Sequence, residues 1–582
     1  MSGFGILIMD GCIQQALIIG TERLAAWADL LDSINVFPVA DADTGRNLVV
    51  SLSPLQHIGT VPDDIARRLL FAACGNSGNI AACFLSEFLQ FTRISDMHQS
   101  ARSGRDAAWN SVADPRPGTM LTIFDALVDI LAIENPMESD AWSRVIDHLE
   151  SAVRRTPDLL PALKNAGVVD AGALGMFIFF EGFFGRLFDP DRPFIPVTER
   201  FGNQLRIIHD VDSKTHPGHC VNAVIRLNPE QKEAVPPSVE WGESVVVTRD
   251  QTYVKIHLHT ADRDAVRKKI DSVGQLINWS DEDMDVESLS FKPSGHGAIH
   301  IMTDAAGSIP RSLARQLEIT LLDSYIVADG LSLPETHFPP SDLYRIMNDG
   351  GKVSTAQASV FQRHQHYQSV LSRFERVIYL CVGSIYTGNY QVATQWKAEN
   401  DPEDRLTVID TGAASGRLGT IVLATIRFMS GHNDPEDVIR FAQHVPDHCE
   451  GFVFLDQLRF LAAGGRLSRT GAFWGDLLHV KPVISPTAQG ARKVGTVRDQ
   501  PAQLRFAITK IDRASRTGRL PLILLEYSNN LEWVQTVAQP VVHACCPDSE
   551  IVLHPLSLTS GVHMGPGTWG IAYQKEVGKE NI

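Results

Sequence analysis

Cysteine is scarce in this chain, and its scarcity excludes a disulfide-built protein. Only 8 of the 582 residues are cysteines, and no two of them have the spacing of a zinc finger or a redox motif. We therefore expect no disulfide framework and a reducing, cytoplasmic location. The apolar N-terminus lacks a basic segment and is interrupted by Asp10, so we expect no secretory signal there.

Long hydrophobic runs and an excess of basic residues are also missing. The most apolar later stretch, residues 172–188, is broken by Glu181 and is short for a bilayer, so we expect no membrane insertion. The 52 lysines and arginines are outnumbered by 68 aspartates and glutamates, which gives a formal net charge of −16. Because nucleic-acid binders concentrate basic residues on one face, we expect no nucleic-acid partner.

The length exceeds what one hydrophobic core organises, and the residue pattern changes twice along the chain. Apolar residues at three- and four-residue spacing predict helices across residues 10–188, except for a polar stretch at 93–118 that we expect to be a loop. Short strands with one amphipathic helix follow, and from residue 299 onward strands alternate with helices. We therefore predict a multidomain protein with an all-α domain at 1–200, a small α/β middle domain at 201–292 and an α/β domain at 293–582.

The front region contains the segment NVFPVADADTGRN, residues 35–47, in which Asp41 and Asp43 alternate on a tight turn before a helix. Two carboxylates this close can share divalent cations, and magnesium commonly combines one or two aspartates with nucleotide phosphates. The alternative is plain helix capping, because Asp and Thr are favoured at the start of helices. The residues alone leave both interpretations open.

Three small-residue turns follow the aspartates: GNSG at 75–78, PGT at 117–119 and GVVDAGALG at 167–175. Each leads toward a helix, where free backbone N–H groups can face phosphate oxygens. Taken singly, such turns usually do no more than cap helices. The chain has no Walker A lysine motif, so any nucleotide site must be built in another way.

In this order, the four segments resemble the nucleotide-binding domain of the dihydroxyacetone kinase and fatty acid kinase families. The resemblance covers about the first 190 residues and implies a DhaL-like, all-helical barrel that binds ATP and two magnesium ions. It makes Asp41 and Asp43 the magnesium ligands and places a further set around the metals and the nucleotide: Asn35, Thr44, Asn76, Ser77, Thr119 and Gly172. Ala42 and Arg46 depart from the family pattern, and we expect Arg46 either to alter the access of the phosphates or to add positive charge beside them.

The middle region contains two histidines, His257 and His259, that lie two apart in a predicted strand and therefore share one face. With Cys220 from a neighbouring strand they form a chemically sensible zinc site, although two outward polar residues on an exposed sheet are the simpler interpretation. The segments around them resemble the middle domain of the kinase component of fatty acid kinase. That resemblance implies that Cys220, His257 and His259 hold a structural zinc ion.

The rear region carries scattered hydroxyl, arginine and histidine motifs, in order TDAAGSIP, TAQAS, GSIYTGNY, GGRLS, KPVIS and HMGPG. Singly, each suits an ordinary turn. Jointly they resemble the DegV family of fatty-acid-binding proteins over about residues 299–572, which implies two α/β lobes enclosing an acyl chain. The implied ligands of the fatty acid are Thr355, Thr387 and His563, with Arg466 and Arg498 supplying positive charge around an acyl phosphate.

Together these regions predict a phosphotransferase with a carboxylate acceptor, that is, a fatty acid kinase fused to its lipid carrier. Asp41, Asp43, Arg466 and Arg498 are the expected catalytic residues, with ATP and Mg²⁺ as cofactors and Zn²⁺ as a structural ion. The acyl phosphate would pass to an acyltransferase, and a homodimer is left open. Two rivals are a dihydroxyacetone-type kinase and a non-catalytic lipid carrier or regulator.

Overall fold

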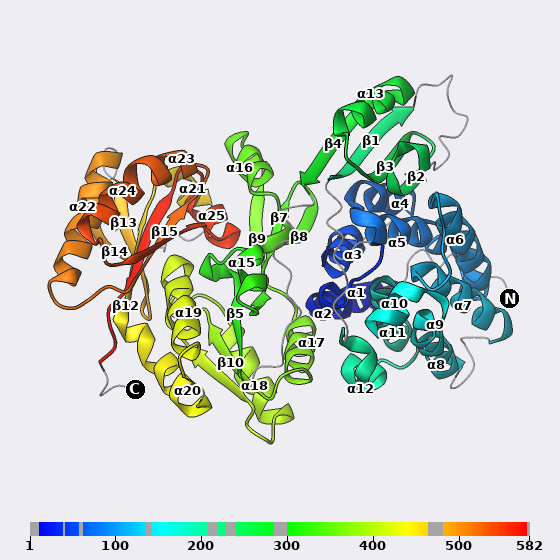
Figure 1. The fold of residues 1–582 in the computed structure, drawn as a ribbon, viewed down its shortest axis with the longest axis horizontal. Helices are drawn as coiled ribbons and strands as arrows, with labels where there is room; N and C mark the ends of the chain where they lie inside the picture. Colours follow the sequence, from blue (N-terminus) through cyan, green and yellow to red (C-terminus); the bar gives the residue numbers. More distant parts are fainter. Residues whose placement is uncertain are drawn as a thin grey trace. The chain divides into compact units, whose positions relative to one another are not determined.

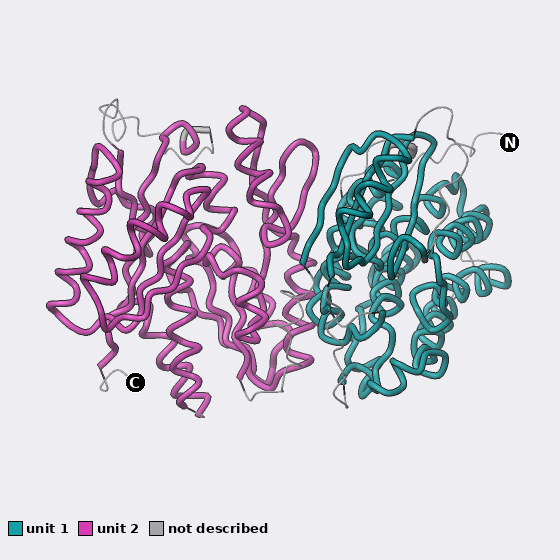
Figure 2. Tube along the Cα trace, turned by 45° about the horizontal axis from the view of Figure 1, so that its top comes forward, with its two compact units in different colours: residues 1–294 teal, residues 295–582 magenta. Residues whose placement is uncertain are grey.

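The computed structural model of the chain divides into two compact units, residues 1–294 and 295–582, each considered by itself below (Figure 2). The structure describes residues 11–38, 41–56, 62–134, 141–207, 218–227, 239–283, 299–432, 434–463 and 481–578. Arg466, one of the expected catalytic residues, lies outside these ranges.

Helices make up the first 200 residues of unit 1, as predicted (Figure 1). They pack around α11 (Ala171–Phe188), whose residues from Ala171 to Gly185 are all buried. Gly20 in α1 and Gly182 in α11 allow these two helices to cross closely, since a Cβ on Gly182 would lie 2.8 Å from the Cα of Gly20. The remaining helices are α1 (Gly11–Ala26), α2 (Ala28–Ser33), α3 (Thr44–Leu52), α4 (Pro62–Ala72), α5 (Gly75–Phe88), α6 (Met97–Ser111), α7 (Met120–Ile133), α8 (Ala141–Arg154), α9 (Thr156–Leu159), α10 (Pro161–Ala166) and α12 (Val197–Phe201).

The expected loop at residues 93–118 is wrong in its larger part, because it contains helix α6. The buried positions of α6 follow a helical spacing, but most are small or polar: Met97, Ala101, Gly104, Ala108 and Ser111. The small residues allow α6 to approach α5 so closely that a Cβ on Gly104 would lie 2.6 Å from the carbonyl oxygen of Phe84. A search for large apolar residues misses such a helix.

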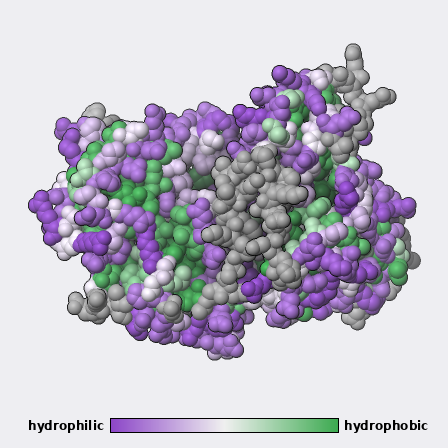
Figure 3. Space-filling model, viewed as in Figure 1, coloured by the Kyte–Doolittle hydropathy of each residue, from purple (hydrophilic) through white to green (hydrophobic). Residues whose placement is uncertain are grey.

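Helix α11 is long and apolar enough to cross a membrane, yet 83% of its apolar window is buried inside unit 1. Glu181, in the second half of α11, forms a buried ion pair with Arg23 and a second ion pair with the partly buried Arg200. Burying these charges in pairs removes most of the cost of taking them out of water. The face drawn in Figure 3 shows mainly hydrophilic residues over the helical part of unit 1, as expected when its apolar helix is internal.

The middle region of unit 1 is an antiparallel sheet in the order β2-β3-β1-β4, with helix α13 (Arg263–Val273) on one side. Strands β1 (His219–Leu227), β2 (Glu243–Arg249) and β3 (Tyr253–Thr260) and helix α13 confirm the prediction, whereas β4 (Gly274–Asp283) was not expected. One face of the sheet is apolar and packs against Val266 and Ile270 of α13. The alternation of strand residues places Lys255, His257 and His259 on the opposite face.

Unit 2 is the predicted α/β domain, built on two main sheets. The first is parallel, in the order β11-β10-β5-β6; α19 (Ser415–Met429) covers one face, and α17 (Val360–Leu371) and α18 (Asn389–Asn400) cover the other. The second, in the order β14-β13-β12-β17-β15-β16, packs against α22 (Gln500–Ser515) and α24 (Gln539–Cys545). A small sheet, β8-β7-β9, completes the unit. The two large sheets with their helices form the two expected α/β lobes.

The strands of unit 2 have the following bounds: β5 (Ile299–Asp304), β6 (Thr320–Leu322), β7 (Tyr325–Ala328), β8 (Leu331–Pro334), β9 (Val353–Ala356), β10 (Arg376–Cys381), β11 (Leu406–Asp410), β12 (Cys449–Phe454), β13 (Lys481–Thr487), β14 (Gly490–Val497), β15 (Leu522–Tyr527), β16 (Glu550–Pro555) and β17 (Trp569–Gln574). Its other helices are α15 (Arg311–Gln316), α16 (Pro340–Asn348), α20 (Pro435–His444), α21 (Leu458–Ala463), α23 (Leu531–Trp533) and α25 (Leu558–Met564).

Candidate functional site

Both aspartates of the front turn are oriented by side-chain amides. Asn35 Nδ2 donates to Asp41 Oδ1 at 2.6 Å, and Asn47 Nδ2 donates to Asp43 Oδ2 at 2.7 Å. Oxygen donors of this kind suit magnesium, which takes carboxylates together with water and phosphate oxygens. The sequence identified Asn35 but missed Asn47, although Asn47 closes the same motif.

The capping interpretation of Asp43 does not match the hydrogen bonds of α3. Asp43 occupies the position before the helix but makes no side-chain capping bond to the described first turn. Asp32 of α2 does so instead, because its Oδ1 accepts from the backbone N–H of Gly45 at 2.7 Å and of Arg46 at 3.2 Å. The carboxylate of Asp43 is therefore not required to cap its own helix.

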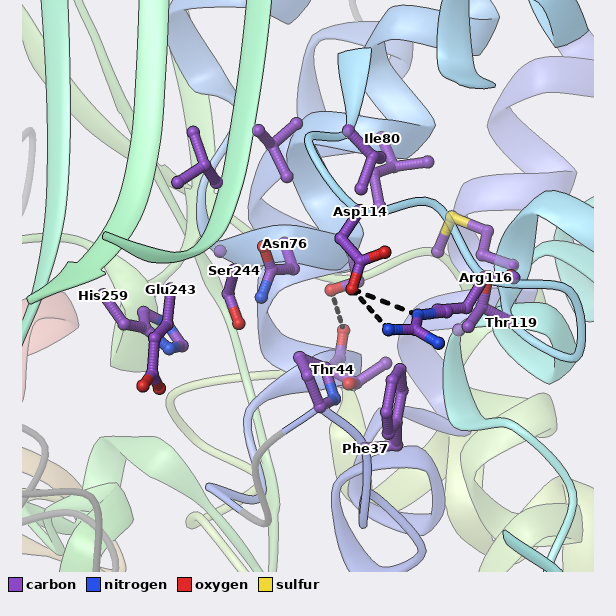
Figure 4. Close-up of a pocket in the computed structure, with 18 of the residues that line it drawn as sticks. Phe37, Thr44, Asn76, Ile80, Asp114, Arg116, Thr119, Glu243, Ser244 and His259 are labelled. Carbon is purple, nitrogen blue, oxygen red and sulfur yellow. Dashed lines mark hydrogen bonds and ion pairs between the residues drawn. The ribbon is translucent and has the colours of Figure 1, made fainter. Parts of the chain in front are cut away.

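A cavity of about 530 Å³ opens in unit 1 beside this turn (Figure 4). All eight residues that the sequence assigned to metal and nucleotide line it: Asn35, Asp41, Asp43, Thr44, Asn76, Ser77, Thr119 and Gly172. They meet because the motifs lie at or near the N-termini of α3, α5, α7 and α11. Apolar residues such as Phe37, Ile80 and Leu160 line the same cavity, so it offers both polar and apolar walls.

Local backbone features explain how these turns present their polar groups. Gly75 has φ +61°, in the left-handed region that favours glycine, and a Cβ there would collide with Asn47. Asp170 accepts from the N–H of Ala173 at 2.7 Å and so caps α11. Burial raises the pKa of the Asp170 carboxyl to about 7, against the effect of its backbone hydrogen bonds. Asp170 also lines the cavity and was missed, although it stands within GVVDAGALG.

The middle sheet supplies one wall of the cavity, which the sequence did not predict. Residues 242–246 and His259 line it, and Ser244 has a positive φ of 55°. The N–H of Ala113 donates to the carbonyl of Val245 at 3.0 Å, which joins β2 to the loop after α6. Figure 4 shows Glu243 and His259 next to each other, and Asp114 and Arg116 forming an ion pair elsewhere in the wall. This wall is created by tertiary contacts between segments far apart in the sequence, and no local motif indicates it.

Cys220, His257 and His259 come together on the polar face of the middle sheet. Their ligand atoms all lie within 4.8 Å of one another, since Cys220 of β1 pairs in register with His259 of β3. His257 is fully buried, and burial holds its pKa well below the ordinary value, so it is a neutral imidazole. Neutral imidazoles and a cysteine sulfur are the donors that zinc prefers. These residues fit the zinc that the sequence resemblance implies.

Two of the predicted fatty-acid ligands in unit 2 lie together. Thr355 Oγ1 of β9 lies 3.4 Å from His563 Nε2 of α25. The start of α25 is fixed by Glu335, whose Oε2 accepts from the N–H of Thr559 at 2.9 Å. Burial raises the pKa of Glu335 to about 8, so this carboxyl is protonated at neutral pH.

Two further predicted groups of unit 2, Thr387 and Arg498, stand beside the ends of secondary-structure elements. Thr387 precedes α18, and its hydroxyl accepts from the N–H of Asn389 at 3.3 Å. Asn389 in turn donates to the buried Asp304 at 2.7 Å, which fixes the start of this helix. Arg498 is exposed directly after β14, and Arg466 lies outside the described residues.

Comparison with known proteins assigns a family model to each region of the chain. Residues 38–185 match the DAK2 domain, residues 216–289 match the FakA-like middle domain of fatty acid kinase, and residues 298–576 match the DegV family. The chain therefore joins a DAK2 domain and a FakA-like middle domain to a C-terminal DegV-family domain. This confirms the predicted fusion and the kinase-related character of the front half.

Individual relatives match about half of the chain. An uncharacterized protein of Staphylococcus saprophyticus is 29% identical over 307 residues, which are 47% of this chain and 55% of the relative. Protein YloV of Bacillus subtilis is 27% identical over 310 residues, 48% of this chain and 56% of that protein. The chain thus spans about half the length of these curated relatives.

Solved structures of DegV-family proteins also match about half of the chain. A DegV-family protein from Thermus thermophilus, described by its fatty acid binding, is 24% identical with a TM-score of 0.43; the match covers 48% of this chain and all of the other. DegV of Bacillus subtilis, described as a fatty acid binding protein, is 21% identical with a TM-score of 0.43 and the same coverage.

Proposed function

We propose that the protein is a fatty acid kinase that transfers the γ-phosphate of ATP to the carboxylate of a fatty acid held in unit 2. The observation that carries this proposal is the 530 Å³ cavity, in whose wall Asp41 and Asp43 stand together with the three small-residue turns. The match of residues 216–289 to a fatty acid kinase middle domain supports the acceptor class. The product would be an acyl phosphate.

Phosphoryl transfer to a carboxylate requires positioning of the reactants and neutralisation of charge more than it requires proton transfer. A fatty acid is already a carboxylate at neutral pH, so its attack on phosphorus needs no general base. Magnesium held by Asp41 and Asp43 would neutralise phosphate charge when bound. The turns at Asn76, Ser77 and Thr119 would orient the phosphates through hydrogen bonds.

On the acceptor side, Thr355, Thr387 and His563 would hold the fatty acid carboxylate in unit 2. Arg466 and Arg498 would offset negative charge on the acyl phosphate. The acyl phosphate is a reactive mixed anhydride, so we propose that a cytoplasmic acyltransferase consumes it.

The test is direct detection of the product. Purified chain is incubated with ATP, Mg²⁺ and a panel of fatty acids, and acyl phosphate is trapped with hydroxylamine as the hydroxamate. We expect product with the unaltered chain and none with Asp43→Asn, while Asp129→Asn, an exposed change in α7, leaves the yield unchanged. Thr355→Val should weaken fatty acid binding, measured by lipid co-purification and mass spectrometry, without changing nucleotide binding.

Two outcomes would contradict the proposal and favour its rivals. Lipid that co-purifies with a chain yielding no acyl phosphate would favour a non-catalytic carrier. Phosphorylation of dihydroxyacetone in place of fatty acids would favour the other kinase class.

A further inference from the structure

Carboxyl groups dominate the charged part of the wall of the 530 Å³ cavity, although the nucleotide proposed for it is a polyanion. Five acidic side chains line it: Asp41, Asp43, Asp114, Asp170 and Glu243. Magnesium at Asp41 and Asp43 would offset part of this charge when bound. Among the described residues that line the cavity, Arg116 is the only lysine or arginine. An arginine keeps its positive charge at any physiological pH, so Arg116 is the side chain best suited to meet phosphate oxygens there.

The backbone of Arg116 is held firmly at the edge of the cavity. Pro115 and Pro117 flank it, and both restrict the chain, since a residue that precedes a proline is confined to extended conformations. Thr119 Oγ1 donates to the carbonyl oxygen of Arg116 at 2.8 Å. Gly118 has φ +87°, and a Cβ there would lie 2.9 Å from the side chain of the last residue of α9. The turn therefore presents Arg116 from a fixed point.

The side chain of Arg116, in contrast, lies in an exposed ion pair. It is 57% exposed, and its partner Asp114 is 62% exposed. The Nε and Nη2 of Arg116 both donate to Oδ2 of Asp114, at 3.1 and 2.6 Å, and Figure 4 shows the two side chains facing each other. Within the described part of the chain, this guanidinium has no other ion-pair partner.

The balance of energies favours exchange of Asp114 for a phosphate. An exposed ion pair between two side chains contributes little to stability, because water screens it and both side chains lose freedom. Arginine binds phosphate through charge-assisted hydrogen bonds, often two in parallel, and these are stronger than neutral ones. The phosphates of a bound nucleotide should therefore displace Asp114 from Arg116.

We propose that Arg116 binds the phosphates of the nucleotide and that Asp114 holds its guanidinium when no nucleotide is bound. The inference rests on the proposed function, because it takes the cavity to hold ATP, and it adds a phosphate ligand that no sequence motif indicated. On binding, the guanidinium exchanges Oδ2 of Asp114 for phosphate oxygens, and the displaced carboxylate stays in contact with water. No covalent bond changes in this step.

The test separates contacts to phosphate from contacts to the base and ribose in the full-length chain. A fluorescent ATP analogue is displaced, with Mg²⁺ present, by ATP, by inorganic triphosphate or by adenosine. Arg116→Gln should weaken binding of ATP and of inorganic triphosphate about tenfold, since hydrogen bonds to a charged group are lost, and should leave adenosine binding unchanged. Arg93→Gln is the matched control, because Arg93 forms an exposed ion pair with Asp96, at 3.3 Å, and does not line the cavity.

Asp114→Asn distinguishes a phosphate ligand from a structural clamp. This change breaks the same ion pair as Arg116→Gln but keeps the cation and removes a competing carboxylate, so ATP and inorganic triphosphate should bind more tightly. An equal weakening in both variants would overturn the inference, because it would assign the ion pair only to holding the turn in place.

The remaining outcomes separate this inference from the proposed function. Unchanged binding of inorganic triphosphate in Arg116→Gln, or an equal loss for adenosine, overturns the role of Arg116 while the kinase proposal stands. Failure of the unaltered chain to bind ATP at all overturns the proposed function and, with it, the inference.

Discussion

The side-chain amide of Asn47 donates to Oδ2 of Asp43 at 2.7 Å, and its carbonyl oxygen Oδ1 accepts from the thiol of Cys74 at 3.4 Å. Cys74 directly precedes Gly75, the first residue of the GNSG turn. One side chain therefore joins the aspartate turn to a small-residue turn. Its amide fixes the rotamer of the carboxylate that we propose as a magnesium ligand.

Replacing Asn47 with leucine should weaken magnesium binding. Asn47→Leu keeps the side-chain size but removes the donor to Asp43, so we expect about a tenfold loss of Mg²⁺ affinity in the presence of nucleotide, and a stability loss of about 1–3 kcal/mol. Calorimetric titration of Mg²⁺ measures the first and denaturant unfolding the second. Asn400→Leu, which removes a bond of 2.9 Å to the carbonyl of Trp396, is the control. A loss of stability with unaltered Mg²⁺ affinity would contradict this role.

Replacing Asp32 and replacing Asp43 should have different effects on the free energy of unfolding and on metal binding. Asp32 is buried and caps α3 through two backbone N–H groups, so Asp32→Ala should lower the free energy of unfolding by about 1–2 kcal/mol. Asp43→Ala removes no cap and should cost less stability, yet it should abolish metal binding. Thermal unfolding with and without Mg²⁺ and ATP separates the two, because only Asp32→Ala should retain stabilisation by the ligands. The reverse pattern would restore the capping interpretation of Asp43.

The part of the unit 1 site that is formed by the aspartate turn and the three small-residue turns could be predicted, because each of these motifs is a short segment of the sequence. Each one lies at or near a helix N-terminus, so a short segment carries both the structure and the chemistry. Asn47, Asp170 and the wall at residues 242–246 could not be found in this way, because their importance depends on which segments meet in space. The same limit applies to Asp32, whose capping role for a later helix is visible only in the folded chain.

In the fold, the elements with large apolar residues in a regular pattern could be predicted, and those built from small residues could not. Strands β5 and β10 could be predicted from the sequence because they are rich in apolar residues. Such strands are typical of parallel sheets that are covered on both faces. Helix α6 packs through Ala101, Gly104 and Ala108, whose low hydrophobicity conceals the helical spacing. Close backbone approach replaces side-chain volume there.

The cluster of Cys220, His257 and His259 predicts bound zinc. We expect about one zinc ion per chain in protein purified without chelator, measured by inductively coupled plasma mass spectrometry, because these three donor types suit zinc. Cys220→Ala should lose the metal, whereas Cys12→Ala, at an exposed cysteine, should keep it. Metal-free protein that retains full thermal stability would contradict a structural zinc site.

Glu335 should make unit 2 less stable as pH rises. Burial raises its pKa from 4.5 to about 8, so the folded protein keeps a proton that the unfolded chain loses near pH 4.5. Between these values the unfolded state binds fewer protons, and stability therefore falls with increasing pH until about pH 8, where the effect ends. Glu335→Gln mimics the protonated carboxyl, so its melting temperature should decline less than that of the unaltered chain between pH 5 and about 8. Asp342→Asn, at an exposed carboxylate of α16, should follow the unaltered profile. Parallel profiles for Glu335→Gln and the unaltered chain would show that Glu335 ionises in the folded protein as it does in the unfolded chain.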